Sequence, residues 1–477
     1  MINSFFYNQI ISKLEHTPTQ GQIETINSLS AFFEDKNGYC VFLLTGFAGT
    51  GKTTLISSLI KVLHDIKIKS VLLAPTGRAA KVLSSYSGHN ASTIHKCIYR
   101  KKNTKQANSI FDINYNPHKN TIFIVDESSM IGNIDNNSIF GSGRLLDDLL
   151  NFVFSGNNCR LIFLGDTAQL PPIGTLISPA LDKKELESMD MKVYHSQLYQ
   201  VVRQSVNSGI LYNATIIRNK INNVEHLIPK LKLDAFNDII TINGTDLIEE
   251  IDNSYSKYGL EETKIICKTN KFANNYNIGI RNRILYYESE ICNGDLLMVV
   301  KNNYSWLPED TEIDFIANGD ILKVIKVGKT TEIYGYRYID LVVNFVDFPE
   351  LEIGVKVILD SLTIDAAGLD ASYYKNLYNQ LLENYSYIAN KKKQNEAIMN
   401  DPYFNALQVK FGYAITCHKS QGGQWKSVFL DHGWIDINAI KTSAEIRYEF
   451  LRWLYTAFTR ASEKLYLVNF WNELLIF

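Results

Sequence analysis

A glycine-rich segment near the N-terminus constrains this chain more than any other feature of its sequence. Residues 46–53 read GFAGTGKT and match the pattern GxxxxGK[ST]; the apolar run YCVFLLT precedes them and the amphipathic segment TTLISSLIKVLHD follows. A strand, a glycine-rich turn and a helix in this order wrap backbone N–H groups around a phosphate chain at the positive end of the helix. The sequence therefore predicts an α/β nucleotide-binding domain of the P-loop type.

The residues of this loop have separate expected roles. Lys52 is expected to reach the β- and γ-phosphates of ATP, and the Thr53 hydroxyl to ligate Mg²⁺. Both ATP and Mg²⁺ are therefore the expected cofactors. The predicted nucleotide contacts in this loop are Gly46, Ala48, Gly49, Thr50, Gly51, Lys52, Thr53 and Thr54.

Two later apolar runs, TIFIVDE at 121–127 and CRLIFLGD at 159–166, end in acidic residues. Because the carboxyl ends of parallel strands meet at one crevice, both ends are expected beside the P-loop. Asp126 is then expected to hold Mg²⁺, and Glu127 to orient and deprotonate water. Gln169, in the loop GDTAQLPP, is placed to sense a γ-phosphate. Taken alone, the two acids also suit an exposed turn, and Gln169 an ordinary loop amide.

The bulk composition is that of a multi-domain globular protein. The 477 residues correspond to about three domains of ordinary size. A net charge of -2 gives no general sign of nucleic-acid binding, so a cationic track would have to be local. The six cysteines contain no CxxC pair, which argues against a zinc site. With no signal peptide and no run of about eighteen apolar residues, we expect a cytoplasmic protein without a membrane segment.

The alternation of apolar runs and helical periods predicts an α/β fold with two nucleotide-domain-like parallel sheets. Residues 1–191 form the first expected domain, with a polar, hairpin-like insertion at about 84–120. A second set of α/β signals begins near Lys192, so 192–290 and 405–477 form the second expected domain. The insert between them, 291–404, combines Asn-Gly turns with short β-rich runs, which predicts a small antiparallel barrel. Its end, 371–397, has a helical period.

Eight segments, in chain order, resemble the motifs of superfamily-one helicases: GFAGTGKTT, APTGRAAK, STIH, VDESSM, GDTAQLPP, VVRQ, GYAITCHKSQGGQW and LYTAFTRA. They are most similar to the RecD-like branch that includes phage Dda and the Pif-type helicases, over residues 17 to 468. The resemblance implies two RecA-like domains, an SH3-like barrel in the second, and an ATP-dependent DNA helicase. The segment APTGRAA lacks the bulky aromatic residue of the oppositely directed branch, which favours 5′-to-3′ movement.

The same resemblance implies roles for residues outside the P-loop. Gln22 is expected to read adenine, and Arg203 and Arg460 to bring positive charge from the second domain to the γ-phosphate. Without the motifs, Gln22 suits a solvated helix start and each arginine a surface salt bridge. The implied nucleic-acid track consists of Pro75, Thr76, Arg78, Thr93, His95, Thr416, His418, Lys419, Ser420 and Gln421.

Several alternatives stay open at this point. The insertion 84–120 lies where relatives carry a strand-separating hairpin, and Phe111 or Tyr115 would either stack at the fork or pack in the fold. The segment 371–397 suits a tower that braces the hairpin, a partner-binding arm or packed helices. The expected partners are single-stranded DNA and forked duplex DNA, bound by a monomer, in roles such as repair or recombination. An RNA- or hybrid-directed motor, or a nucleotide-gated DNA-binding protein without unwinding, are the alternatives.

Overall fold

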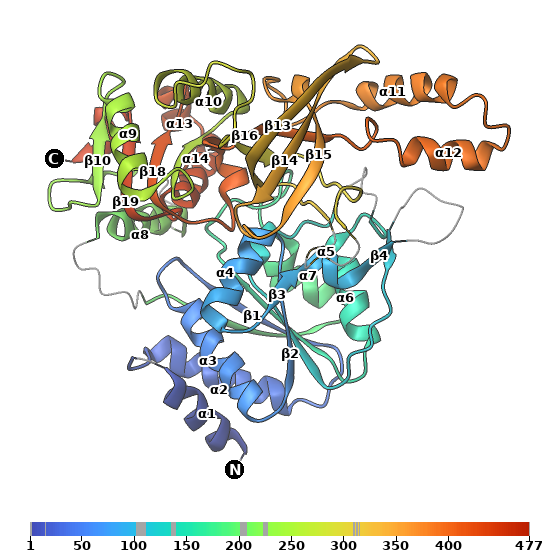
Figure 1. Ribbon diagram of the computed structural model, residues 1–477. Helices are drawn as coiled ribbons and strands as arrows, with labels where there is room; N and C mark the ends of the chain where they lie inside the picture. Colours follow the sequence, from blue (N-terminus) through green and yellow to red (C-terminus); the bar gives the residue numbers. More distant parts are fainter. Residues whose placement is uncertain are drawn as a thin grey trace.

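The computed structural model describes residues 2–14, 16–101, 111–134, 140–200, 208–222, 228–308, 311, 313 and 315–476. Two parallel sheets and a closed barrel form its framework (Figure 1). The predicted fold class, two α/β units with a hairpin in the first and a barrel with helices in the second, is confirmed. Within the described part of the chain, no helix is both long and apolar enough to cross a membrane.

The first sheet has six parallel strands, and its central apolar runs are buried, as expected for a parallel sheet with both faces covered. Its strand order is β3 (Ala91–Thr93), β2 (Lys69–Ala74), β6 (Thr121–Val125), β7 (Arg160–Gly165), β1 (Cys40–Gly46) and β8 (Lys192–Leu198). The helices of this unit are α1 (Ile2–Lys13), α2 (Gln20–Glu34), α3 (Lys52–Asp65), α4 (Gly77–Ser87), α5 (Ile94–Ile98), α6 (Leu145–Ser155) and α7 (Lys183–Ser188).

Strand β8 corrects the predicted start of the second unit. The sequence predicts that Lys192 opens the second sheet, but Lys192 pairs with Cys40 and the whole of β8 runs parallel to β1. As an edge strand, β8 is only partly buried, so its sequence KVYHSQL lacks the continuous apolar run of the central strands. The chain therefore leaves the first sheet after Leu198.

The second sheet has five parallel strands. Their order is β10 (Ile239–Ile242), β19 (Ala461–Val468), β18 (Trp425–Asp431), β11 (Thr263–Cys267) and β17 (Ala414–Thr416). The helices of this unit are α8 (Gly209–Asn222), α9 (Leu247–Tyr258), α10 (Asn270–Arg283), α13 (Ile437–Thr442) and α14 (Ala444–Phe458), and a short pair joins β9 (Leu231–Lys232) to β20 (Leu475–Ile476).

A closed five-stranded barrel interrupts the second unit. Its strands are β12 (Leu296–Val299), β13 (Ile321–Ile333), β14 (Tyr336–Phe345), β15 (Glu352–Ile358) and β16 (Leu407–Phe411). The last strand lies beyond residue 404, the predicted end of the insert. It pairs with β15 in parallel, not antiparallel as predicted. Parallel neighbours need a long connection, and the helices between β15 and β16 provide it.

That connection contains two helices, α11 (Ala371–Asn384) and α12 (Lys391–Met399), which extend away from the barrel (Figure 1). The helical period over 371–397 therefore belongs to a pair, held together in part by a 2.7 Å bond from the Tyr378 hydroxyl to Asn395. Leu377 and Leu381 of α11 pack with Tyr338 of β14 in a tyrosine-rich cluster. The packing explains the helical pattern, while the tower and partner-arm alternatives stay untested.

The predicted insertion at 84–120 contains a hairpin, but its first strand begins only at Tyr99. Strands β4 (Tyr99–Lys101) and β5 (Phe111–Ile113) pair antiparallel, as predicted. Residues 84–98 belong instead to α4, β3 and α5, so they are part of the domain itself. Lys102, Lys105 and Ser109, between the two strands, lie outside the described residues.

Candidate functional site

The P-loop lies between β1 and α3, as its sequence predicts. Gly49 and Gly51 both have φ of +79°, a left-handed backbone that glycine adopts without the cost of a Cβ. Gly51 is the N-cap of α3 and supplies no side-chain cap. The first N–H groups of this helix are therefore left to bind an anion such as a phosphate.

Lys52 points back over the loop from the first turn of α3. Its ammonium group donates to the carbonyl oxygens of Gly46 (2.5 Å) and Phe47 (3.0 Å). The Thr50 hydroxyl also donates to the Phe47 carbonyl, at 2.8 Å. The positive charge thus lies inside the curve of the loop, where a triphosphate fits.

The predicted metal-binding carboxylate is fixed by two hydrogen bonds at the end of β6. Asp126 accepts the backbone N–H of Glu127 at Oδ1 (2.8 Å) and the Tyr86 hydroxyl at Oδ2 (2.5 Å). Burial and the charge of Asp126 raise the pKa of Tyr86, and a bond from the Thr53 side chain opposes the rise. Tyr86 thus touches both predicted metal ligands, whose hydroxyl and carboxylate oxygens are the hard donors that Mg²⁺ takes.

Glu127 occupies a strained and half-buried position. Its φ of +52° is unusual for a residue with a side chain. Burial raises the pKa of its carboxyl group, and the negative charges of Asp126 and Asp166 raise it further. The positive charges of Arg460 and Lys52 lower this pKa, but not enough to cancel the rise. A carboxyl group with a raised pKa is a better proton acceptor at neutral pH than an exposed glutamate. The position agrees with the predicted base.

Two glutamines predicted to contact the nucleotide each bury one polar atom without a partner among the described residues. These atoms are Nε2 of Gln22 and Oε1 of Gln169. Buried amide groups are normally hydrogen-bonded, so an unpaired one indicates a ligand or water partner. A donor at Gln22 and an acceptor at Gln169 fit a bound purine nucleotide and a hydrolytic water.

Gln22 also begins a helix, although not as a solvated residue. It is fully buried, its Oε1 accepts the Thr19 N–H at 3.0 Å, and the Thr19 hydroxyl accepts the Gln22 N–H at 3.2 Å. This capping box stabilises the start of α2. One side-chain atom therefore caps the helix while the other stays available for a base.

Helix α14 of the second unit reaches the first unit at the P-loop. The Tyr455 hydroxyl accepts the N–H of Ala48 at 2.9 Å and donates to Oδ2 of Asp166 at 2.5 Å. Asp166 also accepts the Ala168 N–H at 2.9 Å. One phenol thus joins the P-loop, the end of β7 and the second unit.

Two further side chains of α14 hold the loop that contains Gln169. Arg452 donates to the carbonyl oxygens of Gln169 (3.0 Å) and Thr167 (2.7 Å). The Thr456 hydroxyl accepts the N–H of Leu170 at 2.9 Å. The loop that contains the predicted γ-phosphate sensor is therefore hydrogen-bonded directly to the second unit.

The arginines of the second unit differ in their surroundings. Arg460 is buried and donates to the carbonyls of Thr456 (3.0 Å) and Gly423 (3.1 Å), yet its charge acts on Glu127. Arg203 lies outside the described residues. Arg218, on α8, places its guanidinium 4.4 Å from the centre of the Phe47 ring in the P-loop.

Sequence reasoning missed four residues of this site: Tyr86, Arg218, Arg452 and Tyr455. Tyr455 lies inside the motif LYTAFTRA, so the resemblance held a signal for it. The other three lie in helices whose local pattern indicates only packing. Their role depends on contacts between segments far apart in the chain.

The first-unit part of the predicted nucleic-acid track lies at the ends of adjacent strands. Thr76 follows β2 and caps α4, and Thr93 ends β3 and caps α5; Ala74 pairs with Thr93. Pro75, between Ala74 and Thr76, is half-buried. A Cβ added to Gly422, of the second unit, would lie 3.0 Å from the Thr76 hydroxyl. The two halves of the predicted track therefore meet.

Arg78 and His95 are engaged with protein groups. The Arg78 guanidinium lies 4.4 Å from the centre of the Trp425 ring and donates to the Gln424 carbonyl at 2.8 Å. His95 packs against the rings of Phe140 and Phe315, with centroids 4.8 and 6.4 Å away. Arg78 thus joins the two units, and His95 belongs to an aromatic cluster at the base of the hairpin.

The motif TCHKSQ divides into an outward and an inward part. Thr416 is half-buried and His418 is exposed, while Lys419 donates to the side chain of Asn318 in the barrel. Burial lowers the pKa of Lys419 to about 8. These three residues suit contact with a strand.

Ser420 and Gln421 form the inward part. The Ser420 hydroxyl donates to the Cys417 carbonyl at 2.7 Å, and Gln421 Nε2 donates to the Leu170 carbonyl at 2.6 Å. Both side chains are buried. Gln421 therefore connects the predicted track to the loop of the γ-phosphate sensor.

The two aromatic candidates of the hairpin are placed differently. Phe111 packs between Phe140 and Tyr304, at 4.9 and 4.6 Å between ring centroids. Tyr115 is 74% exposed. The packed alternative applies to Phe111, and only Tyr115 is free to meet a base pair.

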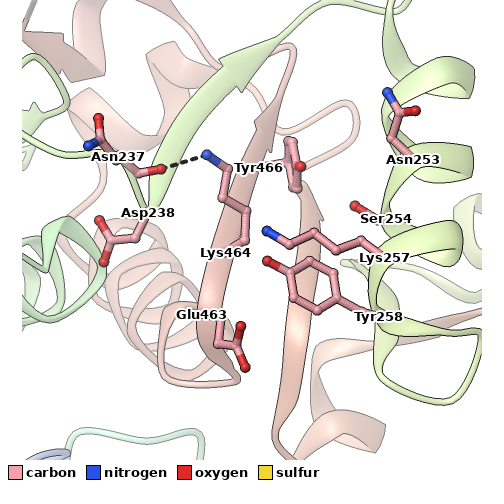
Figure 2. Close-up of a pocket in the computed structure, with 9 residues that line it drawn as sticks. All are labelled: Asn237, Asp238, Asn253, Ser254, Lys257, Tyr258, Glu463, Lys464 and Tyr466. Atoms are coloured by element: carbon pink, nitrogen blue, oxygen red, sulfur yellow. Dashed lines mark hydrogen bonds between the residues drawn. The ribbon is translucent and has the colours of Figure 1, made fainter.

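A separate polar cavity of about 480 Å³ lies beside the second sheet (Figure 2). Lys464 crosses it and donates to the Asn237 carbonyl at 2.6 Å. None of the residues predicted for nucleotide or strand binding lines it. Its lining consists of Asn237, Asp238, Asn253, Ser254, Lys257, Tyr258, Glu463, Lys464 and Tyr466.

Comparison with known proteins places two family matches on this framework. Residues 19–224 match the AAA domain, and residues 411–468 match the UvrD-like helicase C-terminal domain. An uncharacterised protein of Acanthamoeba polyphaga mimivirus is 27% identical over 523 aligned positions, covering 92% of this chain and 97% of the relative. The ATP-dependent DNA helicase Dda of Enterobacteria phage T4 is 26% identical over 330 positions, covering 66% of this chain and 68% of Dda.

Among solved structures, the Pif1 helicase from Bacteroides in complex with ADP-AlF3 and ssDNA is similar at a TM-score of 0.48 and 13% identity, with 97% of this chain and 95% of that chain covered. The two domain matches enclose the P-loop and the motif LYTAFTRA, and the eight motifs keep their order between them. With the similarity to Dda, these findings show that the chain carries the two matched domains in one polypeptide and that it is similar to an ATP-dependent DNA helicase.

Proposed function

We propose that this chain couples ATP hydrolysis to 5′-to-3′ movement along single-stranded DNA and thereby unwinds duplex DNA. The observation that carries the proposal is the position of Leu170, next to the predicted γ-phosphate sensor. Its N–H is bound by Thr456 and its carbonyl by Gln421, both from the second unit. A shift of Gln169 on hydrolysis would therefore be passed directly to the motif TCHKSQ.

The chemistry of the site supports hydrolysis. The loop amides and Lys52 would hold the phosphates, and Thr53 and Asp126 would hold Mg²⁺, which when bound neutralises charge on the β- and γ-phosphates. Glu127 would accept the proton of the attacking water. Arg460 lies close enough to act on Glu127 electrostatically, so closure of the two units would also bring positive charge toward the reacting phosphate.

The choice of DNA rests on the relatives, since Dda is a DNA helicase. The predicted track offers hydroxyl, imidazole and ammonium groups, which suit phosphates and leave base identity unread. The 5′-to-3′ direction rests on the resemblance of APTGRAA and TCHKSQ to that branch. An RNA-directed motor on the same framework is the alternative.

The test uses two duplexes that differ only in the polarity of a single-stranded tail. Unwinding of the 5′-tailed duplex with ATP and Mg²⁺, and none of the 3′-tailed one, is the expected result. ATPase stimulation is measured in parallel with single-stranded DNA and with RNA of the same sequence. Stronger stimulation by RNA would support the alternative, and stimulation without unwinding would leave only translocation.

A further inference from the structure

We propose that Tyr86 is a positioning residue of the magnesium site, which holds the Asp126 carboxylate in the orientation that the metal requires. The inference rests on the proposed use of Thr53 and Asp126 as metal ligands. It concerns a residue outside all eight motifs, in the last turn of α4. Nothing in the sequence around Tyr86 indicates a metal or a nucleotide.

The first observation is the set of bonds on Asp126. Oδ1 accepts the Glu127 N–H at 2.8 Å and Oδ2 accepts the Tyr86 hydroxyl at 2.5 Å. Together these two donors fix both the rotation and the tilt of the carboxylate. Each oxygen keeps a second lone pair, so the carboxylate still has capacity to bind a cation.

The second observation is how the phenol is held. The Ser57 hydroxyl, on α3, donates to the Tyr86 carbonyl at 2.8 Å, and the phenol also interacts with the Thr53 side chain of the same helix. The Tyr86 ring packs against the apolar core behind the first sheet. Tyr86 therefore spans the helix that bears one predicted ligand and the strand end that bears the other.

The third observation is that neighbouring side chains of α4 cannot replace this contact. The Ser84 hydroxyl donates to the Ala80 carbonyl within its own helix, and Ser85 donates to the Val82 carbonyl. Both are short and internally bonded. Only the long phenol of Tyr86 crosses from α4 to the end of β6.

Hydrogen bonds to a ligating group commonly decide how well it binds its metal, and their loss typically weakens metal affinity by about 10- to 100-fold. Tyr86→Phe removes the hydroxyl and keeps the packed ring. We therefore expect the affinity of the nucleotide complex for the metal to fall by about 10-fold or more. Nucleotide binding in the absence of metal should not change.

The matched control is Tyr194→Phe. The Tyr194 hydroxyl donates to Oδ2 of Asp35 at 2.7 Å, also from a partly buried phenol in the first unit. Neither residue is part of the predicted nucleotide site. Loss of this bond removes a similar contact and should leave metal affinity at the wild-type value.

The experiment uses the full chain with Mn²⁺ as the probe. Binding of a fluorescent ADP analogue is first measured in EDTA, and free Mn²⁺ is then followed by electron paramagnetic resonance as metal is added to the ADP complex. Melting temperatures are recorded for all three proteins. Unchanged Mn²⁺ affinity in Tyr86→Phe would overturn the proposal, as would an equal loss in Tyr194→Phe.

Other outcomes also decide. If Tyr86→Phe loses ADP binding in EDTA, the residue supports the P-loop and not the metal, and the proposal fails. If Tyr86→Phe melts far below the wild type, Tyr86→Leu is measured as a second variant without the hydroxyl. A folded Tyr86→Leu protein with the Mn²⁺ affinity of the wild type would overturn the proposal. Failure of the wild type to bind ADP would instead count against the proposed function.

Discussion

The hydroxyl of Tyr455 donates a 2.5 Å hydrogen bond to Oδ2 of Asp166, although the two residues belong to different parallel-sheet units and lie 289 positions apart. The same hydroxyl accepts the N–H of Ala48 in the P-loop. Ala48 lies in the P-loop and Asp166 follows β7, and Tyr455 is buried. This buried phenol therefore links the apposition of the two units to the P-loop.

Tyr455→Phe should uncouple the two units without unfolding either of them. Hydrogen bonds to charged groups contribute about 1.5–3 kcal/mol, so a loss of roughly 10-fold or more in strand-stimulated ATP turnover is expected. ATP affinity should change less, because Lys52 is untouched and, among the loop amides, only the Ala48 N–H loses a partner. Steady-state ATPase assays with saturating single-stranded DNA measure this effect.

Tyr276→Phe is the matched control for this prediction. The Tyr276 hydroxyl donates a 2.5 Å bond to Oδ2 of Asp431, but both residues belong to the second unit. The control should keep strand-stimulated turnover. Wild-type turnover in Tyr455→Phe would mean that the contact between the units is incidental.

The P-loop and the predicted base should separate binding from hydrolysis. Lys52→Ala removes the positive charge that contacts the transferring phosphate but removes little packing. ATP hydrolysis should therefore be abolished in a protein that still folds. Glu127→Gln should retain ATP and hold DNA tightly, because it removes the base and keeps the shape. Filter binding of ATP and DNA, beside phosphate release, distinguishes the two variants. Normal hydrolysis in Glu127→Gln would assign water activation to another residue.

Arg460→Ala should lower strand-stimulated turnover by about 10³-fold or more if its guanidinium acts on the reacting phosphate. The structure adds an expectation about stability. Arg460 is 3% exposed, and its loss leaves the Gly423 carbonyl without this donor, while the Thr456 carbonyl keeps its bond from the Thr459 hydroxyl. Buried unsatisfied acceptors cost about 1–3 kcal/mol each, so the melting temperature should also fall.

Arg460→Lys separates these two effects. The lysine keeps the charge but has fewer donors than the planar guanidinium. Turnover that recovers in Arg460→Lys would indicate a role of charge alone. For Arg203→Ala, the sequence predicts a similar loss of turnover, with a much smaller fall in ATP affinity.

How far the sequence predicted this molecule depended on the range of each interaction. The positions of the P-loop, Asp126 and Glu127 were predictable because an apolar run typical of a buried strand directly precedes each of them. The place of β8 in the first sheet was not predictable, because the sequence of an edge strand of mixed polarity does not indicate its partner strand. Tyr86 meets Asp126 across 40 positions, and no local pattern encodes such a contact.

The motif TCHKSQ illustrates the same limit within the predicted nucleic-acid track. Resemblance placed Ser420 and Gln421 in the nucleic-acid track, beside Lys419. Both side chains instead bond inward, and Gln421 binds the Leu170 carbonyl of the first unit. A motif tells which residues work together, but the direction of each side chain follows from the packed fold.

The last prediction concerns the hairpin as a strand separator. Tyr115 is exposed next to it, so Tyr115→Ala should lower unwinding of 5′-tailed forked duplexes several-fold while strand-stimulated ATPase stays near the wild-type rate. The motor and the fork contact are separate elements, and an exposed ring contributes little to stability. A gel-based unwinding assay and an ATPase assay on the same preparations measure the two quantities.

Asn116→Ala is the neighbouring control, because Asn116 is buried and donates to the carbonyls of Phe152 (2.8 Å) and Val153 (3.2 Å). Its loss should lower the melting temperature and reduce both activities together. Equal loss of unwinding and ATPase in Tyr115→Ala would mean that Tyr115 supports the fold or the track. Unwinding from a 3′ tail alone would overturn the predicted direction, but it would leave the nucleotide site intact, since Lys52, Asp126 and Glu127 act before any choice of polarity.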